Sequence, residues 1–453
     1  MILAIDQGTT GTTCLALDDD RRVTGRGYRE LPQHFPQPGW VEHDPDEIWA
    51  TVTEAAADAG GEPTVVAITN QRETTLLWDR ATGKAVAPAI VWQDRRTAER
   101  CRELDAELIR RKTGLVPDPY FSATKLEWLL RERGSSDGLA FGTVDSFLVW
   151  RLTGGDQHVI DVTNASRTLL VDLETLEWDD ELLALFGIPR ELLPRIVGSA
   201  ESIGYGELNG RTVEIRGIAG DQQAALYGQG CHAPGEGKAT YGTGSFVLVH
   251  TGDDASGPPD GLLKTAAADG YALEGAVLTS GAAIQWLRDG LGLVGSAAET
   301  EALATSVDDT AGVHFVPALT GLGSPWWDAD ARGLVTGLTR GTTAAHLVRA
   351  ALEAIAHQVA DVVEALPGAP RVLRADGGAT ANGFLMQFQA DLLQVPVEVA
   401  AERETTALGA AALAAGWESG VAVGAVYEPR RSVDEVAALR AGWRFALGLT
   451  RSS

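Results

Sequence analysis

The sequence predicts an α/β protein whose two domains pack across a cleft, and three observations support this fold class. The chain has 453 residues, which exceeds one ordinary hydrophobic core and favours two domains of about 200 residues each. Segments typical of strands alternate with segments of helical periodicity, which indicates helices layered on sheets. A short hairpin pattern near the start also recurs close to the middle of the chain.

The first hairpin is expected in residues 2–20, which read ILAIDQGTTGTTCLALDDD. An apolar run ends in Asp6, a turn of Gly, Thr and Gln follows, and a second apolar run from Cys14 to Leu17 leads back into acidic residues. This pattern predicts two strands joined by a tight turn. The first strand thus delivers a carboxylate to a turn lined with backbone amides and hydroxyl groups.

A similar pattern occurs at residues 239–251, which read ATYGTGSFVLVHT. Turns of Gly and Thr are common, so the similarity is weak alone, but its position near mid-chain strengthens it. We expect each half of the chain to open with such a hairpin. No long linker of Pro and Ser separates the halves, which predicts domains at 1–225 and 226–453 with a short hinge near residues 220–230.

The last third of the chain alternates between helix and strand patterns. Residues 347–366 place five large apolar side chains on one face of a helix, namely Leu352, Ile355, Val359, Val362 and Leu366. RVLRADGG (371–378) predicts a strand and a glycine turn, NGFLMQFQADLL (382–393) a helix, and VPVEVA (395–400) a strand. TTALGAAALAAG (405–416) predicts a helix of small residues that packs closely against a neighbour.

Charge and composition exclude several classes of function. The net charge of −25 argues against nucleic acid and anionic membranes as partners. No apolar run reaches the roughly 18 residues of a membrane span, and no basic region precedes the first apolar stretch as in a signal peptide. We therefore expect a cytoplasmic protein whose three cysteines are reduced. The eight histidines form no HExxH pattern or close pair, so no transition-metal site is expected.

Three glycine-containing turns could bind an anion: DQGTTGT (6–12), YGTGS (241–245) and DGGATAN (376–382). Each alone is more often an ordinary turn. Glycine lets backbone N–H groups approach a phosphate, threonine adds hydroxyl donors, and a helix after DGGAT would direct its N-terminus at a ligand. None matches the GxxxxGK[ST] or GxGxxG patterns. Two hairpins facing each other across a cleft would suit a triphosphate.

These hairpins and the later DGGA resemble the actin-like ATPase superfamily of sugar kinases, whose domains are ribonuclease H-like. Three longer segments resemble the FGGY carbohydrate kinases within it: YFSATKLEWL (120–129), TGLGSPWWDADARG (320–333) and GLTRGTTAAHLVRAALEAIA (337–356). Six shorter ones are similar to members of this family that act on glycerol: GWVEHDP (39–45), ITNQRETT (68–75), IVWQDRR (90–96), DPYFS (118–122), TNASRT (163–168) and GIAGDQQAAL (217–226).

The resemblance implies phosphorylation of glycerol to sn-glycerol 3-phosphate by ATP, with Mg²⁺ as a cofactor. Asp6 is the expected Mg²⁺ partner, because this ion favours one or two carboxylates together with phosphate oxygens; an Asp that caps the turn is the alternative. Asp221, at the end of an apolar strand pattern, is expected to accept the proton of the attacking hydroxyl. Without the resemblance, Asp221 could equally cap a helix.

The resemblance also places Arg72 and Glu73 on the glycerol hydroxyls, which a donor fork and an acceptor carboxylate can recognise. Neighbours on a strand point to opposite faces, so an ordinary surface pair is the alternative. Trp92 and Phe246 would form an apolar wall, although Trp92 alone would more often be a core residue. The complete set of implied substrate residues is Arg72, Glu73, Trp92, Tyr120, Asp221, Gln222 and Phe246.

On the nucleotide side, the resemblance implies contacts from Thr9, Thr10, Gly11, Thr12, Thr243, Gly281, Gln285, Gly378 and Asn382. Relatives often carry an arginine near Thr13, and its absence leaves one fewer charge for the phosphates. The alternative functions are an FGGY kinase for another small polyol or sugar, and a non-catalytic actin-like nucleotide-binding protein. Glycerol and ATP are the expected partners, and assembly into a homo-oligomer stays open.

Overall fold

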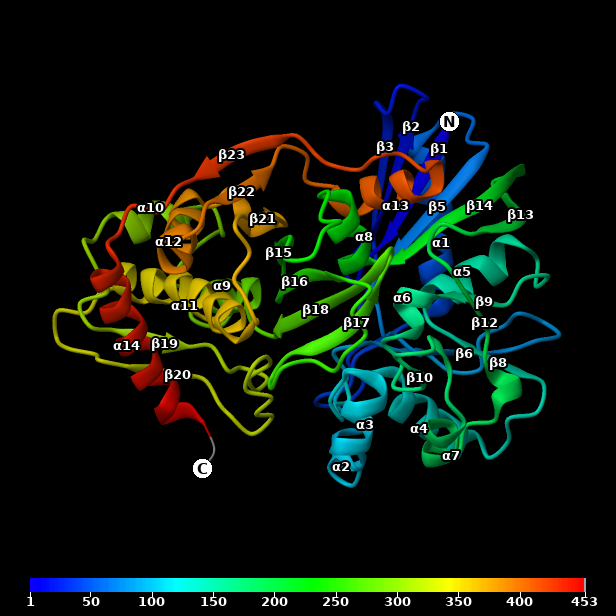
Figure 1. Ribbon diagram of the computed structural model, residues 1–453, viewed down its shortest axis with the longest axis horizontal. Coiled ribbons are helices and arrows are strands. Elements are labelled where there is room, and N and C mark those ends of the chain that lie inside the picture. The colour runs from blue at the N-terminus through cyan, green and yellow to red at the C-terminus, as the bar shows by residue number, and fades with distance from the viewer. Residues whose placement is uncertain (452–453) are drawn as a thin grey trace.

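The computed structural model describes residues 1–451 and contains two large sheets, which confirms the predicted α/β class (Figure 1). The first sheet has six strands, in the order β13 (Ser202–Leu208), β14 (Arg211–Gly220), β5 (Val65–Asn70), β1 (Ile2–Gln7), β2 (Gly11–Leu17) and β3 (Val23–Glu30). Helices α1 (Pro45–Ala59) and α5 (Val144–Leu152) share a hydrophobic core with one face of this sheet.

The second sheet has seven strands, in the order β17 (Leu263–Ala267), β18 (Gly270–Val277), β16 (Ser245–Gly252), β15 (Gly237–Tyr241), β21 (Leu373–Asp376), β22 (Val397–Ala400) and β23 (Val423–Tyr427). One core joins it to α9 (Gly281–Asp289), α10 (Glu299–Thr305), α11 (Ala344–Ala365) and α12 (Gly383–Leu393). Helix α14 (Val433–Thr450) packs on α11 through Trp443 and Ala354.

Both sheets contain the expected hairpin. Strands β1 and β2 pair antiparallel, and β5 lies parallel to β1 on its other side. In the same way, β15 and β16 pair antiparallel, and β21 lies parallel to β15. The repeated pattern in the sequence therefore corresponds to a repeated arrangement of strands, with one Gly- and Thr-containing turn at the end of each hairpin.

Two helices, α8 (Asp221–Gly228) and α13 (Thr405–Ala415), lie between the sheets (Figure 1). Helix α13 covers the second face of the first sheet, although it follows strands of the second sheet in the chain. The helices cross closely, because a Cβ atom on Gly409 would lie 1.9 Å from the carbonyl oxygen of Ala224. This confirms the prediction that the small-residue helix packs tightly against a neighbour.

The remaining elements are smaller helices and short strand pairs, most of them beside the first sheet, whereas β19, β20 and η2 lie with the second. The helices among them are α2 (Ala98–Arg102), α3 (Ala106–Thr113), α4 (Ser122–Arg133), α6 (Val162–Ala165), α7 (Asp180–Phe186), η1 (Arg190–Leu192) and η2 (Gly378–Ala381). Five two-stranded pairs complete the fold: β4 (Glu42–His43) with β7 (Ala89–Ile90), β6 (Leu76–Asp79) with β8 (Leu139–Gly142), β9 (Val159–Asp161) with β12 (Arg195–Val197), β10 (Val171–Asp172) with β11 (Glu177–Trp178), and β19 (His314–Val316) with β20 (Leu334–Thr336).

The predicted elements of the last third are present with small shifts. The apolar stripe lies on α11, which begins three residues earlier than expected. The DGGATAN turn does not lead directly into an α-helix: one 3₁₀ turn, η2, precedes α12 at Gly383. Within residues 1–451, none of the helices combines the length and apolar character that crossing a membrane requires.

Candidate active site

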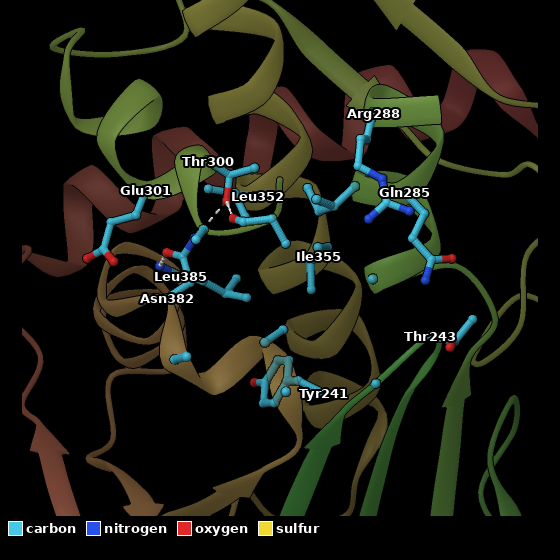
Figure 2. Close-up of a pocket in the computed structure, with 18 residues that line it drawn as sticks. Tyr241, Thr243, Gln285, Arg288, Thr300, Glu301, Leu352, Ile355, Asn382 and Leu385 are labelled. Atoms are coloured by element: carbon cyan, nitrogen blue, oxygen red, sulfur yellow. Dashed lines mark hydrogen bonds between the residues drawn. The ribbon is translucent and has the colours of Figure 1, made fainter. Parts of the chain in front are cut away.

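Two cavities meet at the turn of the second hairpin. The smaller cavity has a volume of about 210 Å³ and lies next to the ends of β1, β5 and β14. The larger cavity has a volume of about 500 Å³ and lies between the turn, α9 and α12 (Figure 2). Gly242 and Thr243 line both of them. A ligand bound in the larger cavity can therefore extend past this turn to reach the smaller one.

The smaller cavity collects all seven predicted substrate residues, together with Thr9, Thr10, Thr240, Gly242, Thr243 and Gly244. Three aromatic rings form its apolar wall. The ring of Trp92 packs edge-on against Tyr120 and Phe246, with centroid distances of 5.6 and 6.1 Å. The indole N–H of Trp92 donates to the hydroxyl of Thr9 at 2.9 Å. This hydrogen bond connects the aromatic wall to the first hairpin turn.

Arg72 and Glu73 do not lie on a strand. The alternative interpretation, an ordinary surface pair, assumed that they were neighbours on a strand. Strand β5 ends at Asn70, and the backbone then turns so that Glu73 has a φ of +61°. Both residues are about 98% buried and both line the smaller cavity. The alternation of side chains along a strand therefore does not separate them.

Each member of this pair has its main charged partner elsewhere. Arg72 donates to both carboxylate oxygens of Glu274 at 2.6 and 3.0 Å, whereas it lies 3.8 Å from Glu73. Arg167 donates to Glu73 at 2.6 Å and to Glu274 at 2.9 Å. Burial raises the pKa of Glu274, but the charges of Arg167 and Arg72 outweigh burial and lower it to about 2. Two guanidinium groups and two carboxylates thus balance each other below the cavity.

No role was predicted from the sequence for Arg167 or Glu274. Arg167 lies in the TNASRT segment, a motif that does not by itself indicate which carboxylates its charge will meet. Glu274 lies in β18 of the second sheet, within the apolar run YALEGAVL. A single buried acid inside a strand was the available signal, because such a charge needs a partner.

Asp221 begins α8 at the point where β14 ends, and its side chain is 30% exposed at the cavity. It does not cap the helix, since Gly220 occupies the cap position. Its two carboxylate oxygens accept from the backbone N–H and the side-chain amide of Gln222 at 2.7 and 3.2 Å, and Arg72 lies 3.4 Å away. Burial raises the pKa of Asp221 against the effect of Arg72. The result is an oriented carboxylate that can accept a proton.

Asp6, at the end of β1, lies in a region of excess negative charge. Burial and the charges of Asp221 and Asp376 raise the pKa of Asp6 to about 7. Asp376 ends β21 in the second sheet; its Oδ2 accepts from Gln229 at 2.7 Å and from Thr405, while its buried Oδ1 has no hydrogen-bond partner among the described residues. The DGGATAN turn was predicted to bind an anion because of its glycines, and no role was predicted for the carboxylate of Asp376.

This charge arrangement fits a hydrated divalent cation. Within residues 1–451, no three side chains of His, Cys, Asp or Glu lie close enough together to bind a metal ion directly. Mg²⁺ does not need such a cage, because it usually keeps several water ligands and binds one or two carboxylates plus phosphate oxygens. A positive ion would stabilise the charged form of Asp6, whose pKa is raised, and would provide a partner for the unpaired oxygen of Asp376.

The residues expected in the first hairpin turn separate into two groups. Thr9 and Thr10 line the smaller cavity. Thr12 is fully buried, and its hydroxyl pairs with that of Thr51 at 2.8 Å in α1. Gly11 lines neither cavity, and a Cβ atom there would collide with Tyr28. The side chain of Thr12 therefore stabilises the hairpin rather than facing a ligand.

The larger cavity contains the other five residues expected on the nucleotide side: Thr243, Gly281, Gln285, Gly378 and Asn382. Figure 2 shows apolar side chains, including Leu352 and Ile355, between the polar groups of Thr300 and Asn382 on one side and those of Gln285 on the other. The amide of Asn382 donates to the hydroxyl of Thr300 at 3.1 Å. An apolar slot with polar edges suits a flat heterocycle attached to a polar chain.

Comparison with known proteins decides the family. The FGGY family of carbohydrate kinases matches the chain with its N-terminal domain at residues 1–228 and with its C-terminal domain at residues 237–416. The chain belongs to this family. Its relatives include the glycerol kinase of Rhodopirellula baltica, 50% identical over 98% of this chain and 90% of the relative, and that of Acidovorax ebreus, 51% identical over 100% and 95%.

Solved structures of FGGY kinases share the whole architecture. Plasmodium falciparum glycerol kinase with ADP superposes with a TM-score of 0.89, is 34% identical, and covers 100% of this chain and 98% of its own. Xylulose kinase from Lactobacillus acidophilus has a TM-score of 0.88 at 23% identity, over 99% and 97% of the two chains, which shows a common fold alone. The two sheets flanked by helices are therefore the FGGY kinase fold, as the sequence predicted.

Proposed function

We propose that this FGGY kinase transfers the γ-phosphoryl group of ATP to glycerol and forms sn-glycerol 3-phosphate. The small cavity carries this proposal, because it combines a volume of about 210 Å³ with a polar pair, an aromatic wall and a proton acceptor. The identity of about 50% to glycerol kinases supports the same substrate. ATP is supported by the kinase family and by the similar structure with ADP.

Glycerol binding follows from the chemistry of the cavity. Glycerol offers only hydroxyl groups and a short carbon chain for recognition. Arg72 can donate to its hydroxyl oxygens, and Glu73 can accept from its hydroxyl groups. Trp92 and Phe246 provide an apolar surface for the three carbons. Because both charged residues are anchored in a buried network, they are held in place before the substrate arrives.

Phosphoryl transfer gives a role to the larger cavity, to the two hairpin turns and to Asp221. Adenosine occupies the larger cavity, and the phosphates pass the turn at Gly242 and Thr243 towards Thr9 and Thr10. Asp221 orients the attacking glycerol hydroxyl and accepts its proton as the new oxygen–phosphorus bond forms and ADP leaves. Catalysis in such a loose transition state depends mostly on positioning and on stabilising charge.

Mg²⁺ is the proposed cofactor, with Asp6 as its main protein partner and Asp376 nearby. When bound, the ion would neutralise phosphate charge. We expect Asp6→Asn to raise the Mg²⁺ concentration for half-maximal velocity by about tenfold, since an amide provides no net charge for a hard cation. Titration of Mg²⁺ at saturating ATP and glycerol measures this, with calorimetry of Mg-ATP binding as a second readout. An unchanged Mg²⁺ requirement would contradict the assignment of Asp6.

The choice of substrate is tested by ADP release against glycerol, erythritol, xylitol and D-xylulose. We expect kcat/KM for glycerol to exceed that for the five-carbon compounds by at least about 10²-fold, because the larger ligands must displace the aromatic wall. Preference for a five-carbon substrate would instead support the kinase of another polyol or sugar. Absence of ADP release with every compound would support a non-catalytic nucleotide-binding protein.

Two further expectations stay predictions. The proposed boundary between domains 1–225 and 226–453 falls within α8. The side chains of this helix pack both on α13 and on the second sheet. Residues 452–453 of the second domain lie outside the described residues. Limited proteolysis can locate the hinge. A cytoplasmic location is likewise inferred from the sequence alone.

A further inference from the structure

Lys238 is a fully buried cation near the active site, and the proposed reaction gives it no role. It lies on β15 in the second sheet and does not line either cavity. Its ammonium group donates to Oε1 of Gln222 at 2.5 Å and to Oγ1 of Thr240 at 2.7 Å. Both of these partners line the smaller cavity. A charged group therefore lies directly behind two side chains that line the smaller cavity.

The contact with Lys238 determines which way the Gln222 amide points. An ammonium group has three donors and no acceptor, so the amide atom that faces it must be the oxygen. The amide nitrogen then points away from Lys238 and donates to Oδ2 of Asp221 at 3.2 Å. In the flipped orientation, the amide oxygen would face the carboxylate and repel it, and Asp221 would lose this donor.

We propose that Lys238 is a positioning residue for phosphoryl transfer, because it holds Gln222 in the orientation that fixes the carboxylate of Asp221. This inference rests on the proposed function, in which Asp221 accepts the proton. Lys238 acts through Gln222 and does not touch the substrate. Its loss affects the alignment of Asp221 with the attacking hydroxyl more than it affects the binding of either substrate.

The surroundings of Lys238 agree with such a role. Burial lowers the pKa of Lys238, while the carboxylates of Asp376 and Asp221 act in the opposite direction. The other charged groups that act on it are Arg72 and Glu274. A buried lysine is costly unless it is paired and hydrogen-bonded. The contact also joins the start of α8, at the end of the first sheet, to a central strand of the second, so the position of Asp221 depends on both sheets.

The test is Lys238→Met, which keeps the length of the side chain and removes the donor. In the full-length protein, we expect kcat to fall by about tenfold or more, with the KM values for glycerol and ATP within about threefold of wild type. The matched control is Lys264→Met, since Lys264 is also buried on a strand of the second sheet but pairs with Asp254 instead. The control should retain wild-type kcat. A wild-type kcat in Lys238→Met would overturn the proposal.

A double-mutant cycle with Gln222→Met tests the route of the effect. If Lys238 acts through Gln222, the double variant should be no slower than the slower single variant. Independent losses that multiply would overturn the proposal. Should Lys238→Met fail to fold, Gln222→Met tests the proposal instead. This variant leaves Lys238 in place, and the proposal requires that it still lowers kcat. A wild-type kcat in Gln222→Met would contradict the proposal. If the wild-type enzyme prefers another polyol, only the proposed substrate fails, and the same variants are measured with that polyol.

Discussion

Asp221→Asn lowers kcat by about 10²–10⁴-fold in our expectation, which is the usual cost of losing a group that accepts a proton in the transition state. The asparagine amide has the same shape but cannot take up the proton of the glycerol hydroxyl. Asp221 lies at the cavity, held by Gln222 and close to Arg72, and the substitution keeps the shape of its side chain while it removes the charge and one acceptor oxygen.

Steady-state kinetics and calorimetric titration of a non-hydrolysable ATP analogue separate chemistry from binding. Nucleotide affinity should stay within about threefold of wild type, because Asp221 does not line the larger cavity. Asp254→Asn is a suitable control, since Asp254 is an exposed acid on a loop of the same protein. A kcat near the wild-type value in Asp221→Asn would show that another group accepts the proton.

Arg72→Ala is expected to raise the KM for glycerol by about 10²-fold or more and to destabilise the fold. The variant removes a donor to the substrate and the bidentate partner of Glu274. Breaking a fully buried ion pair by removing one member typically costs about 3–5 kcal/mol. The measured quantities are the two KM values and the free energy of unfolding, and the KM for ATP should change little.

A second variant separates the two roles of Arg72. Arg72→Ala combined with Glu274→Gln removes one positive and one negative charge, and leaves Arg167 paired with Glu73. We expect this double variant to recover part of the lost stability but to keep the high KM for glycerol. Recovery of glycerol affinity together with stability would mean that Arg72 is structural, and so would an unchanged KM in Arg72→Ala.

Local patterns in the sequence were sufficient to predict the fold class. The hairpins at β1–β2 and β15–β16 follow from apolar runs interrupted by Gly and Thr, which is a signal confined to neighbouring residues. The apolar stripe of α11 is equally local. The seven substrate residues and five residues of the larger cavity came from the resemblance to FGGY kinases, and the structure brings them together in two adjoining cavities.

The sequence by itself determined the two hairpins, most elements in the last third of the chain and the types of residue that could form a site. Only the tertiary structure decided which charges meet: Arg72 pairs with Glu274, 202 residues away, rather than with its neighbour Glu73. It likewise turned Thr12 towards Thr51 and placed Lys238 behind Gln222. The physical reason is that a buried charge is paired by whichever group the packing of two sheets brings within hydrogen-bond distance, and distance along the chain carries no information about that.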